Sequence, residues 1–258
     1  MMDAITVLKV GGKIVEEPAT LERLLNNFKA IKGNKILVHG GGRSATKLAE
    51  RLGIETKMVE GRRITDTVML EVVTMVYGGL VNKKIVASLQ ALGVNALGLT
   101  GADMNILQSH KREVKTVDYG WVGDVDKANG SALAKLIKEG VVPVVAPLTH
   151  DGKGNMLNTN ADTMAAETAK ALVPYFDVTL IYCFEKAGVL RDENDDDSVI
   201  GRIDKASYAE LKDAGVIVGG MIPKLDNSFS TLESGVKRVL ITKADSLNDL
   251  NKGTKIEL

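Results

Sequence analysis

Two short apolar runs, each ending in glycines, place the strongest constraint on how this chain can fold. Residues 5–10 (ITVLKV) lead into a glycine pair, and residues 35–39 (KILVH) lead into three glycines. Apolar runs of this length bounded by turn residues predict buried strands. Open α/β sheets bind ligands beyond the carboxyl ends of their strands. We therefore expect both glycine turns and Lys9 to border one site, and the lysine favours an anionic ligand.

Amphipathic segments follow each of these strands. Within residues 18–31 the apolar side chains recur at helical spacing, and a second helix is predicted over residues 43–52. Alternation of strands with helices favours a parallel sheet with right-handed crossovers. We therefore assign the chain to the α/β class.

The helical pattern over residues 68–92 is the longest in the chain, and we expect a break near the glycines at 78 and 79. Its apolar positions cover more than one narrow stripe, which is typical of a helix that is deeply buried or packs on a partner chain. We therefore predict a homodimer contact here. Residues 106–125 change to short β segments with turns, which indicates a hairpin excursion of the lid type.

Further elements continue to the C-terminus with no repeat or linker. The remaining strands are predicted at 95–99, 141–147, 178–184, 236–242 and 253–258, the last at a sheet edge. The remaining helices are predicted at 131–139, from 158–162 to near Pro174, at 205–214 and from 219–224 onward. We place a boundary between two lobes near Pro174, which gives residues 1–174 and 175–258.

Composition excludes several classes of protein. Lys+Arg and Asp+Glu are equal at 33 each among 258 residues, so no overall field favours nucleic acid or a membrane surface. No uninterrupted apolar stretch approaches the roughly 20 residues of a membrane helix. A single cysteine, Cys183, excludes a disulfide framework and favours a cytoplasmic setting. In its apolar run, Cys183 is better interpreted as a small buried hydrophobe than as a nucleophile.

Lys9 and Lys224 occupy positions that are unfavourable unless an anion is present. Lys9 ends a buried strand, and Lys224 opens a helix, where a cation opposes the helix dipole. For Lys224 a surface position is the simpler interpretation, because long side chains reach solvent. Glycine turns let backbone N–H groups approach a ligand, although each could be only a tight connection. Neither turn matches the Walker or dinucleotide fingerprint, so a standard P-loop or Rossmann enzyme is disfavoured.

Two further groups of polar residues could act on an anionic ligand. Asn160 or Asp162 could cap the following helix, or Asp162 could position the two lysines; the local sequence leaves both open. Arg62 and Arg63 are consecutive, and an arginine can clamp a carboxylate through two parallel hydrogen bonds. Surface charge is the alternative, and we expect at most one of the pair to be functional. The three histidines have no metal-ligand spacing.

Five motifs, in order, resemble the N-acetylglutamate kinases of the amino-acid kinase family. They are Val7-Leu8-Lys9-Val10-Gly11-Gly12, Val38-His39-Gly40-Gly41-Gly42, Gly61-Arg62-Arg63-Ile64-Thr65, Asn158-Thr159-Asn160-Ala161-Asp162 and Gly219-Gly220-Met221-Ile222-Pro223-Lys224. Each is modest alone, but five in this order are specific and span nearly the whole chain. The resemblance implies a three-layer αβα sandwich with a twisted, mainly parallel central sheet, usually in a homodimer. It also implies an N-terminal lobe for the acyl-glutamate and a C-terminal lobe for ATP.

The resemblance implies roles for the residues at matching positions. Lys9 and Lys224 would be catalytic and stabilise the transferring phosphoryl group, while Asp162 holds both lysines in place. The acyl-amino acid would be bound by Gly41, Gly42, Arg63 and Asn158, with Arg63 on its α-carboxylate. The nucleotide would contact Gly11, Gly12, Glu185, Gly188 and Leu190. ATP would carry the Mg²⁺, so no metal-binding residues are expected in the chain.

The implied reaction is ATP-dependent phosphorylation of the γ-carboxylate of N-acetyl-L-glutamate, in arginine biosynthesis. This acceptor is already an anion near neutral pH, since the unperturbed pKa of Glu is about 4.3. It needs charge neutralisation and positioning rather than a general base. One alternative is a sister kinase acting on another carboxylate, a carbamate or a phosphate, which Arg63 and the 158–162 motif argue against. Another is a non-catalytic nucleotide-binding regulator, which would not require both lysines.

Two positions depart from the family pattern. Glu185 stands where members usually have aspartate, which leaves the detail of its nucleotide contact open. Met104 stands where glycine is common. If its loop flanks the acceptor, the acyl pocket differs from the usual one, and N-succinyl-L-glutamate becomes an alternative acceptor. The chain also lacks the N-terminal extension of arginine-inhibited members, so feedback inhibition by arginine is not expected.

Overall fold

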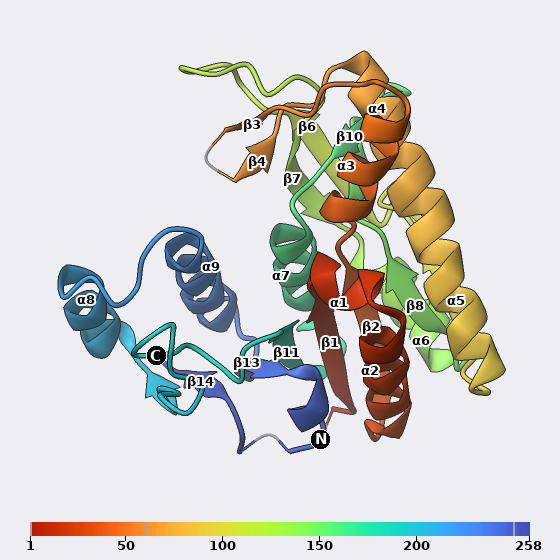
Figure 1. The fold of residues 1–258 in the computed structure, drawn as a ribbon. Helices are drawn as coiled ribbons and strands as arrows, with labels where there is room; N and C mark the ends of the chain where they lie inside the picture. Colours follow the sequence, from red (N-terminus) through yellow and green to blue (C-terminus); the bar gives the residue numbers. More distant parts are fainter. Residues whose placement is uncertain (1, 60, 250) are drawn as a thin grey trace.

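One eight-stranded sheet lies between two layers of helices (Figure 1). The computed structural model describes residues 2–59, 61–249 and 251–258. In spatial order the strands of this sheet are β12 (Arg202–Ile203), β14 (Thr254–Ile256), β13 (Arg238–Lys243), β11 (Asp177–Phe184), β1 (Ala4–Val10), β2 (Asn34–His39), β8 (Val142–Val145) and β5 (Ala96–Leu99). All neighbouring strands are parallel except β13 and β14. The predicted mainly parallel sheet is therefore confirmed.

Two sets of helices cover the opposite faces of this sheet. One set comprises α1 (Gly12–Glu16), α2 (Pro18–Ala30), α3 (Gly42–Arg51), α4 (Thr67–Val73), the π-helix η1 (Thr74–Val81) and α5 (Asn82–Ala91). The other comprises α6 (Gly130–Lys138), α7 (Ala161–Leu172), α8 (Lys205–Asp213) and α9 (Met221–Glu233). Their buried side chains form two separate apolar clusters, one on each side of the sheet. This is the three-layer sandwich that the resemblance implied.

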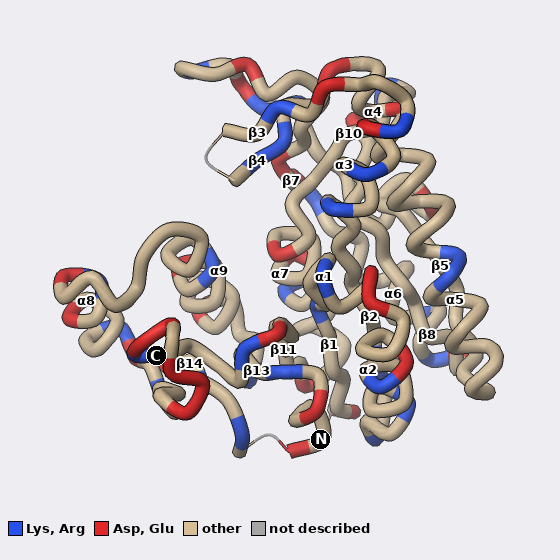
Figure 2. The backbone as a smooth tube through the Cα atoms, viewed as in Figure 1, with Lys and Arg blue, Asp and Glu red and all other residues tan. Residues whose placement is uncertain are grey.

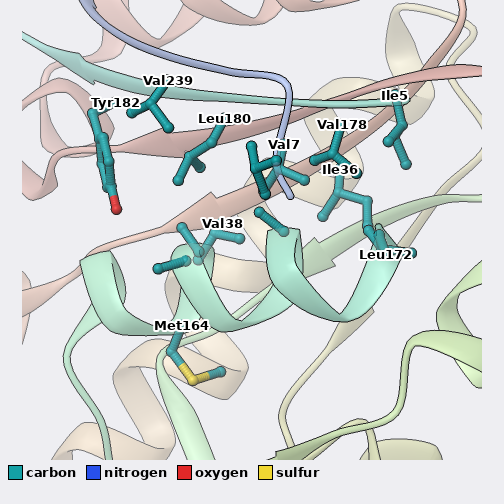
Figure 3. Packing of buried hydrophobic residues seen from close by; sticks show 14 of the residues in the cluster. Ile5, Val7, Ile36, Val38, Met164, Leu172, Val178, Leu180, Tyr182 and Val239 are labelled. Atoms are coloured by element: carbon teal, nitrogen blue, oxygen red, sulfur yellow. The ribbon is translucent and has the colours of Figure 1, made fainter. Parts of the chain in front are cut away.

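Strand β1 shows how alternation along a strand builds both clusters. Ile5 and Val7 belong to the cluster that includes α7, whereas Leu8 and Val10 belong to the cluster on the opposite face. Figure 3 shows the first cluster, where side chains of β1, β2 and β11 are turned towards α7. Because successive strand residues point to opposite faces, Lys9 falls on the same face as Val7. The fold therefore directs Lys9 towards the helix that Asp162 opens.

The longest helical segment is continuous. Its start is capped by Asp66, whose Oδ1 accepts a hydrogen bond of 2.8 Å from the N–H of Met69. The predicted break at the glycines 78 and 79 is wrong, because the chain passes through η1 without leaving helical conformation. By length and composition alone Thr67–Ala91 could span a membrane. Much of one side packs in the core, including Val73 and Val76, as in a core helix.

The predicted excursion forms part of a smaller sheet. In spatial order this sheet comprises β10 (Met156–Asn158), β9 (Leu148–His150), β6 (Leu107–Lys111) and β7 (Gly123–Ala128). The antiparallel pairing of β6 with β7 confirms the hairpin. A separate antiparallel pair joins β3 (Met58–Val59) to β4 (Arg62–Arg63). Figure 1 shows this pair and the loop between β6 and β7 at the same end of the molecule.

The C-terminal strand β14 lies inside the large sheet rather than at its edge. β14 lies between β13 and β12, so it is one strand inside the predicted edge position. The two-residue strand β12 forms the edge because it pairs with the outer side of β14.

Figure 2 shows charges of both signs over the whole molecule, as the equal totals of acids and bases predict. The acidic residues at 192–197 are exposed, as expected for a solvated loop.

Candidate active site

Three charged side chains from distant parts of the sequence meet at the carboxyl end of β1. Lys9 Nζ lies 2.7 Å from Asp162 Oδ1, and Lys224 Nζ lies 3.3 Å from Asp162 Oδ2. The side chains of Lys9 and Lys224 are only 10 % and 13 % exposed. A buried cation is costly unless an anion and hydrogen bonds accompany it. One carboxylate therefore holds two ammonium groups beside each other.

Each member of this trio is positioned by a regular element. β1 delivers Lys9 on the face that packs against α7. The side chain of Asn160 accepts hydrogen bonds from the N–H groups of Asp162 (2.8 Å) and Thr163 (3.1 Å), and so caps α7. Because Asn160 is the cap, the carboxylate of Asp162 is left to the lysines. Lys224 lies in the first turn of α9, where Asp162 offsets the unfavourable placement of a cation.

Burial and the charges of the trio shift the pKa values of Asp162 and Lys224. Burial alone would raise the pKa of Asp162, but the positive charges of Lys9 and Lys224 outweigh it and hold that pKa below its ordinary value. The pKa of Lys224 is lowered from 10.5 to about 8, chiefly by burial, with the charge of Asp162 opposing the shift and that of Lys9 adding to it. Two cations face one carboxylate, so the trio carries an excess positive charge that suits an anion.

Two aromatic rings on β11 lie under the lysines. Lys224 Nζ is 3.5 Å from the ring centroid of Phe184 and 5.8 Å from that of Tyr182, and Lys9 Nζ is 5.4 Å from the Phe184 centroid. Such cation–π contacts contribute about 0.5–2 kcal/mol each, depending on exposure. The sequence analysis missed both aromatic residues. Tyr182 is the register partner of Lys9, so strand alternation along the predicted strand was a signal that could have found them.

The two glycine turns touch each other, as predicted. The N–H of Gly11 donates to Cys183 O (3.1 Å) and the N–H of Gly40 donates to Val10 O (3.0 Å). A Cβ atom on Gly40 would come within 3.1 Å of the backbone nitrogen of Gly12. Beside the turns lies a pocket of about 330 Å³. We call it the phosphate pocket, and it is lined by Gly11, Gly12, Lys13, Gly40, Gly41, Gly42, Arg43, Phe184 and Glu185. A glycine-rich wall of this kind lets backbone groups approach an anion closely.

A second pocket, of about 200 Å³, shares the three glycines at 40–42 with the first. We call it the acceptor pocket, and its other lining residues are Met58, Gly61, Arg62, Arg63, Tyr77, Val122, Pro147, Asn158, Thr159, Asn160 and Ala161. Arg63 Nη2 donates to Gly42 O (2.8 Å), and Asn158 Nδ2 donates to Thr65 Oγ1 (2.9 Å). The predicted acceptor residues therefore line one cavity.

Tyr77, on the π-helix η1, is a lining residue that the sequence analysis missed. A Cβ on Gly41 would lie 2.7 Å from its ring, so the ring packs against the glycine turn. In the sequence Tyr77 was one apolar position of a long helical pattern, with no signal that set it apart. Short π-helical stretches within α-helices occur frequently at functional sites, but a π-helix has no clear sequence signature.

Comparison with known proteins identifies the family. The model of the amino acid kinase family matches residues 4–243. This chain belongs to that family. Among its relatives, the acetylglutamate kinase of Bacteroides thetaiotaomicron is 69 % identical over 257 residues and is covered completely, as is this chain. The acetylglutamate kinase of Methanopyrus kandleri is 39 % identical, over 93 % of this chain and 96 % of its own length.

Solved structures agree with this assignment. A Streptococcus mutans protein has 30 % identity and a TM-score of 0.81, with 98 % of each chain covered. The predicted membership of the acetylglutamate kinases, within the amino acid kinase family, is confirmed. The predicted enzyme class, a phosphotransferase with a carboxyl acceptor, is confirmed with it.

Three residues that follow β11 in this member of the amino acid kinase family are predicted to contact the nucleotide, and each has a different environment in the structure. Glu185 lines the phosphate pocket, and its Oε1 lies 3.9 Å from Lys13 Nζ. Gly188 is buried, and a Cβ there would lie 2.6 Å from Thr254 Oγ1, so packing against β14 already requires a glycine. Leu190 lies farther along the loop, in a bridge to a later segment. The nucleotide contacts of Gly188 and Leu190 stay predictions.

Met104 lies outside the group of residues that line the acceptor pocket. It belongs to the short 3₁₀ turn η2 (Asp103–Asn105), and its side chain is 52 % exposed. A role of Met104 in the acyl pocket required its loop to flank the acceptor, and Met104 is not among the residues that line the acceptor pocket. Its backbone is left-handed, with φ 52° and ψ 18°. Glycine adopts that conformation without strain, whereas methionine does not.

The described residues contain no group of three His, Cys, Asp or Glu side chains that could hold a metal ion. Asp162, the carboxylate closest to the reacting centre, is already engaged by two lysines. These residues fit a Mg²⁺ ion that arrives on the phosphates of a nucleotide. His39 has a structural role, because its Nδ1 bonds Gly40 O (2.8 Å) and its Nε2 bonds Asn82 Nδ2 (3.1 Å). Burial lowers the pKa of His39 to about 4, so its ring is neutral.

Proposed function

We propose that this chain transfers the γ-phosphoryl group of ATP to the γ-carboxylate of N-acetyl-L-glutamate, forming an acyl phosphate in arginine biosynthesis. The observation that carries the proposal is the lysine pair bridged by Asp162. The trio lies beside both pockets, because Phe184 under the lysines lines the phosphate pocket and Ala161 next to Asp162 lines the acceptor pocket. Curated relatives named acetylglutamate kinase support this choice of acceptor.

The lysine pair supplies what the chemistry of this acceptor requires. The γ-carboxylate is ionised near neutral pH, so no side chain has to remove a proton. The obstacle is the repulsion between a carboxylate and a phosphoryl group. Lys9 and Lys224 neutralise the charge that develops, and a fixed geometry of acceptor and donor lowers the barrier further. Arg63 and Asn158 hold the acceptor, with Arg63 on its α-carboxylate.

ATP, with Mg²⁺ on its phosphates, is the proposed phosphoryl donor. Gly11 and Gly12 form the wall against which the phosphates lie, and Glu185, Gly188 and Leu190 border the nucleotide. Bound Mg²⁺ supplies further neutralisation of phosphate charge. We propose that residues 1–174 form the lobe that binds the acyl-glutamate and residues 175–258 the lobe that binds the nucleotide. The lining of the acceptor pocket supports this division, because it lies entirely within the first range.

We also propose a cytoplasmic homodimer that forms through the outer face of the long helical segment. Val68, Met75 and Leu80 on this segment are 49 %, 54 % and 63 % exposed, which is unusual for large apolar side chains on one element. The single buried Cys183 suits a reducing compartment. Light scattering should give twice the chain mass, and the substitution Met75→Glu should shift the equilibrium towards monomer. A monomeric wild-type protein at high concentration would contradict this part of the proposal.

Trapping of the product tests the proposed reaction. The purified protein is incubated with ATP, Mg²⁺, N-acetyl-L-glutamate and hydroxylamine, which converts an acyl phosphate into a hydroxamate with release of phosphate. Added ferric ion then gives a coloured complex with the hydroxamate. We expect hydroxamate and ADP in equal amounts, and neither when the acceptor is omitted. ATP binding without product would favour a non-catalytic regulator. ADP formation only with carbamate or another acceptor would favour a sister kinase.

A further inference from the structure

Phe184, the last residue of β11, has no part in the proposed reaction, although it lines the phosphate pocket. Strand alternation places Tyr182 and Phe184 on the same face of β11. Their rings are nearly parallel, with an interplanar angle of 8° and 6.5 Å between the centroids. Tyr182 is completely buried, whereas Phe184 is half-buried. Phe184 is therefore the ring through which this face of β11 meets the phosphate pocket.

The ring of Phe184 lies under both lysines of the trio. Lys224 Nζ is 3.5 Å from its centroid and Lys9 Nζ is 5.4 Å from it. In the described ranges of the chain, the other lysines and arginines over aromatic rings lie 4.8 Å or more from the centroid. Asp162 reaches Lys224 at 3.3 Å, compared with 2.7 Å for Lys9. The position of Lys224 therefore depends more on the ring than that of Lys9 does.

An aromatic ring holds an ammonium group differently from a carboxylate. The ring face attracts a cation through its quadrupole and carries no net charge. Each lysine has three N–H donors, and Asp162 engages each of them through a single oxygen. A second carboxylate at the position of Phe184 would cancel the excess positive charge of the trio. The ring leaves that charge, and the remaining N–H donors, to the phosphoryl group.

We propose that Phe184 is a positioning residue of the phosphoryl-transfer site. Its ring holds the ammonium group of Lys224 beside Lys9 at the phosphate pocket and favours the charged form of that group. This inference rests on the proposed function, because it takes the lysine pair to act on the phosphoryl group. Burial disfavours the charge of Lys224 and lowers its pKa from 10.5 to about 8. Loss of a ring that stabilises the cation should lower this pKa further.

Three other groups face Lys224, namely Asp162 on α7, Lys9 on β1 and Tyr182 on β11. Against the effect of burial, the two lysines hold the pKa of Asp162 below its ordinary value, and burial raises the pKa of Tyr182. Neither Asp162 nor Tyr182 therefore changes protonation between about pH 6 and about pH 9. A ring substitution that moves the decline in activity near pH 8 then acts on the lysine pair, and most strongly on Lys224, which lies nearer to the ring.

The pH dependence of kcat/KM for ATP tests this role in wild type, Phe184→Leu and Phe184→Tyr. Phe184→Leu keeps an apolar side chain without a ring, so activity should decline about 0.5–1 pH unit below the wild-type decline, as expected for loss of one cation–π contact. At about pH 6.5, where Lys224 is protonated in every variant, kcat should still be about three- to tenfold lower, because the ammonium group is less well placed. Phe184→Tyr keeps the ring and should retain the wild-type decline.

An NMR titration of the lysine side chains measures the same effect without turnover. The signal that is lost in Lys224→Arg assigns the resonance of Lys224. In Phe184→Leu the pKa of Lys224 should be lower than in wild type by about the same 0.5–1 unit. An unchanged pKa, or an unchanged kcat at about pH 6.5, would overturn the inference, as would an equal shift in Phe184→Tyr.

Phe28→Leu is the matched control, because Phe28 is a buried ring on α2 with Lys35 Nζ 5.7 Å from its centroid. Phe28 belongs to the apolar cluster on the face of the sheet opposite α7. This variant should lose thermal stability but keep the wild-type decline and the wild-type kcat. Thermal unfolding checks that each variant has folded, and Phe184→Met replaces Phe184→Leu if the latter is unfolded.

The two proposals fail in different ways. If wild type forms hydroxamate and Phe184→Leu titrates as wild type does, the inference fails and the proposed function survives. If wild type forms no hydroxamate, the proposed function fails and the role of Phe184 in phosphoryl transfer fails with it. The NMR titration then still decides whether the ring stabilises the charge of Lys224.

Discussion

The two ends of the proposed site are built from different kinds of structure. At the phosphoryl end, Lys9, Asp162 and Lys224 come from a central strand and the first turns of two long helices, and all three are largely buried. At the acceptor end, Arg62 and Arg63 form a two-residue strand that lines the acceptor pocket and lies beside a long irregular loop. The reaction that members of a family share requires charges in a fixed arrangement. The choice of acceptor can differ between members, because it depends on loops whose sequence and conformation vary. We therefore expect changes at the first end to lower turnover, and changes at the second to alter specificity.

The largest effect should follow removal of a lysine from the phosphoryl end. We predict that Lys9→Ala lowers kcat by about 10²–10³-fold, because a charged donor aimed at the developing phosphoryl charge is lost. KM for the acyl-glutamate should change by less than about threefold, since Lys9 lies outside the lining of the acceptor pocket. Steady-state kinetics on the purified variant, with its fold checked by circular dichroism, gives both values. Near-normal turnover of the folded variant would show that Lys9 does not stabilise the transferring phosphoryl group.

Loss of the bridging carboxylate should have a smaller effect, because both cations remain. We predict that Asp162→Asn lowers kcat by about tenfold to a hundredfold, since the two ammonium groups then repel each other without a counter-charge. Glu167→Gln, on the same helix and paired with Lys170, is the matched control and should leave kcat unchanged. Equal activities of the two variants would show that Asp162 serves α7 rather than the lysines.

The pH dependence of activity should report Lys224. Its pKa is lowered from 10.5 to about 8, and only the protonated lysine can neutralise the phosphoryl group. The value of kcat/KM, which reports the free enzyme, should therefore fall as pH rises through about 8. Lys224→Arg keeps the charge at high pH and should move this decline above pH 10, even if its maximal activity is lower. A wild-type profile that stays flat to pH 10 would contradict the assignment.

The smallest effect concerns a residue that the structure places outside both pockets. We predict that Met104→Gly raises the free energy of unfolding by about 0.5–1 kcal/mol, because it relieves a left-handed methionine at some entropic cost in the unfolded chain. The ratio of kcat/KM for N-acetyl-L-glutamate to that for N-succinyl-L-glutamate should stay constant. Asn105→Gly is the control: its φ is also 52°, but asparagine tolerates this conformation, so its gain should be smaller. If Met104→Gly changed this ratio of kcat/KM values, the result would show that the loop around Met104 contacts the acyl group of the acceptor.

The same contrast explains what could be predicted from the sequence. The trio was predicted through the family resemblance, because the local sequence left the role of Asp162 open and favoured a surface position for Lys224. The structure overturns that surface position, since Lys224 is largely buried against Asp162. The choice between Asn160 and Asp162 as the cap needed coordinates, since both fit the local pattern. Tyr77 was missed because the π-helix shifts the helical phase by which a face is assigned. The position of Met104 was open because the path of a loop depends on contacts that local sequence does not encode.

A double-mutant cycle across the lysine pair tests the central claim most directly. The measurement is the single-turnover rate of phosphoryl transfer in wild type, Lys9→Met, Lys224→Met and the double variant. Because both lysines are held by Asp162 against one phosphoryl group, they should act as a unit. The account predicts that the double variant is hardly slower than the slower single variant. Losses that multiply, as for independent sites, would contradict it.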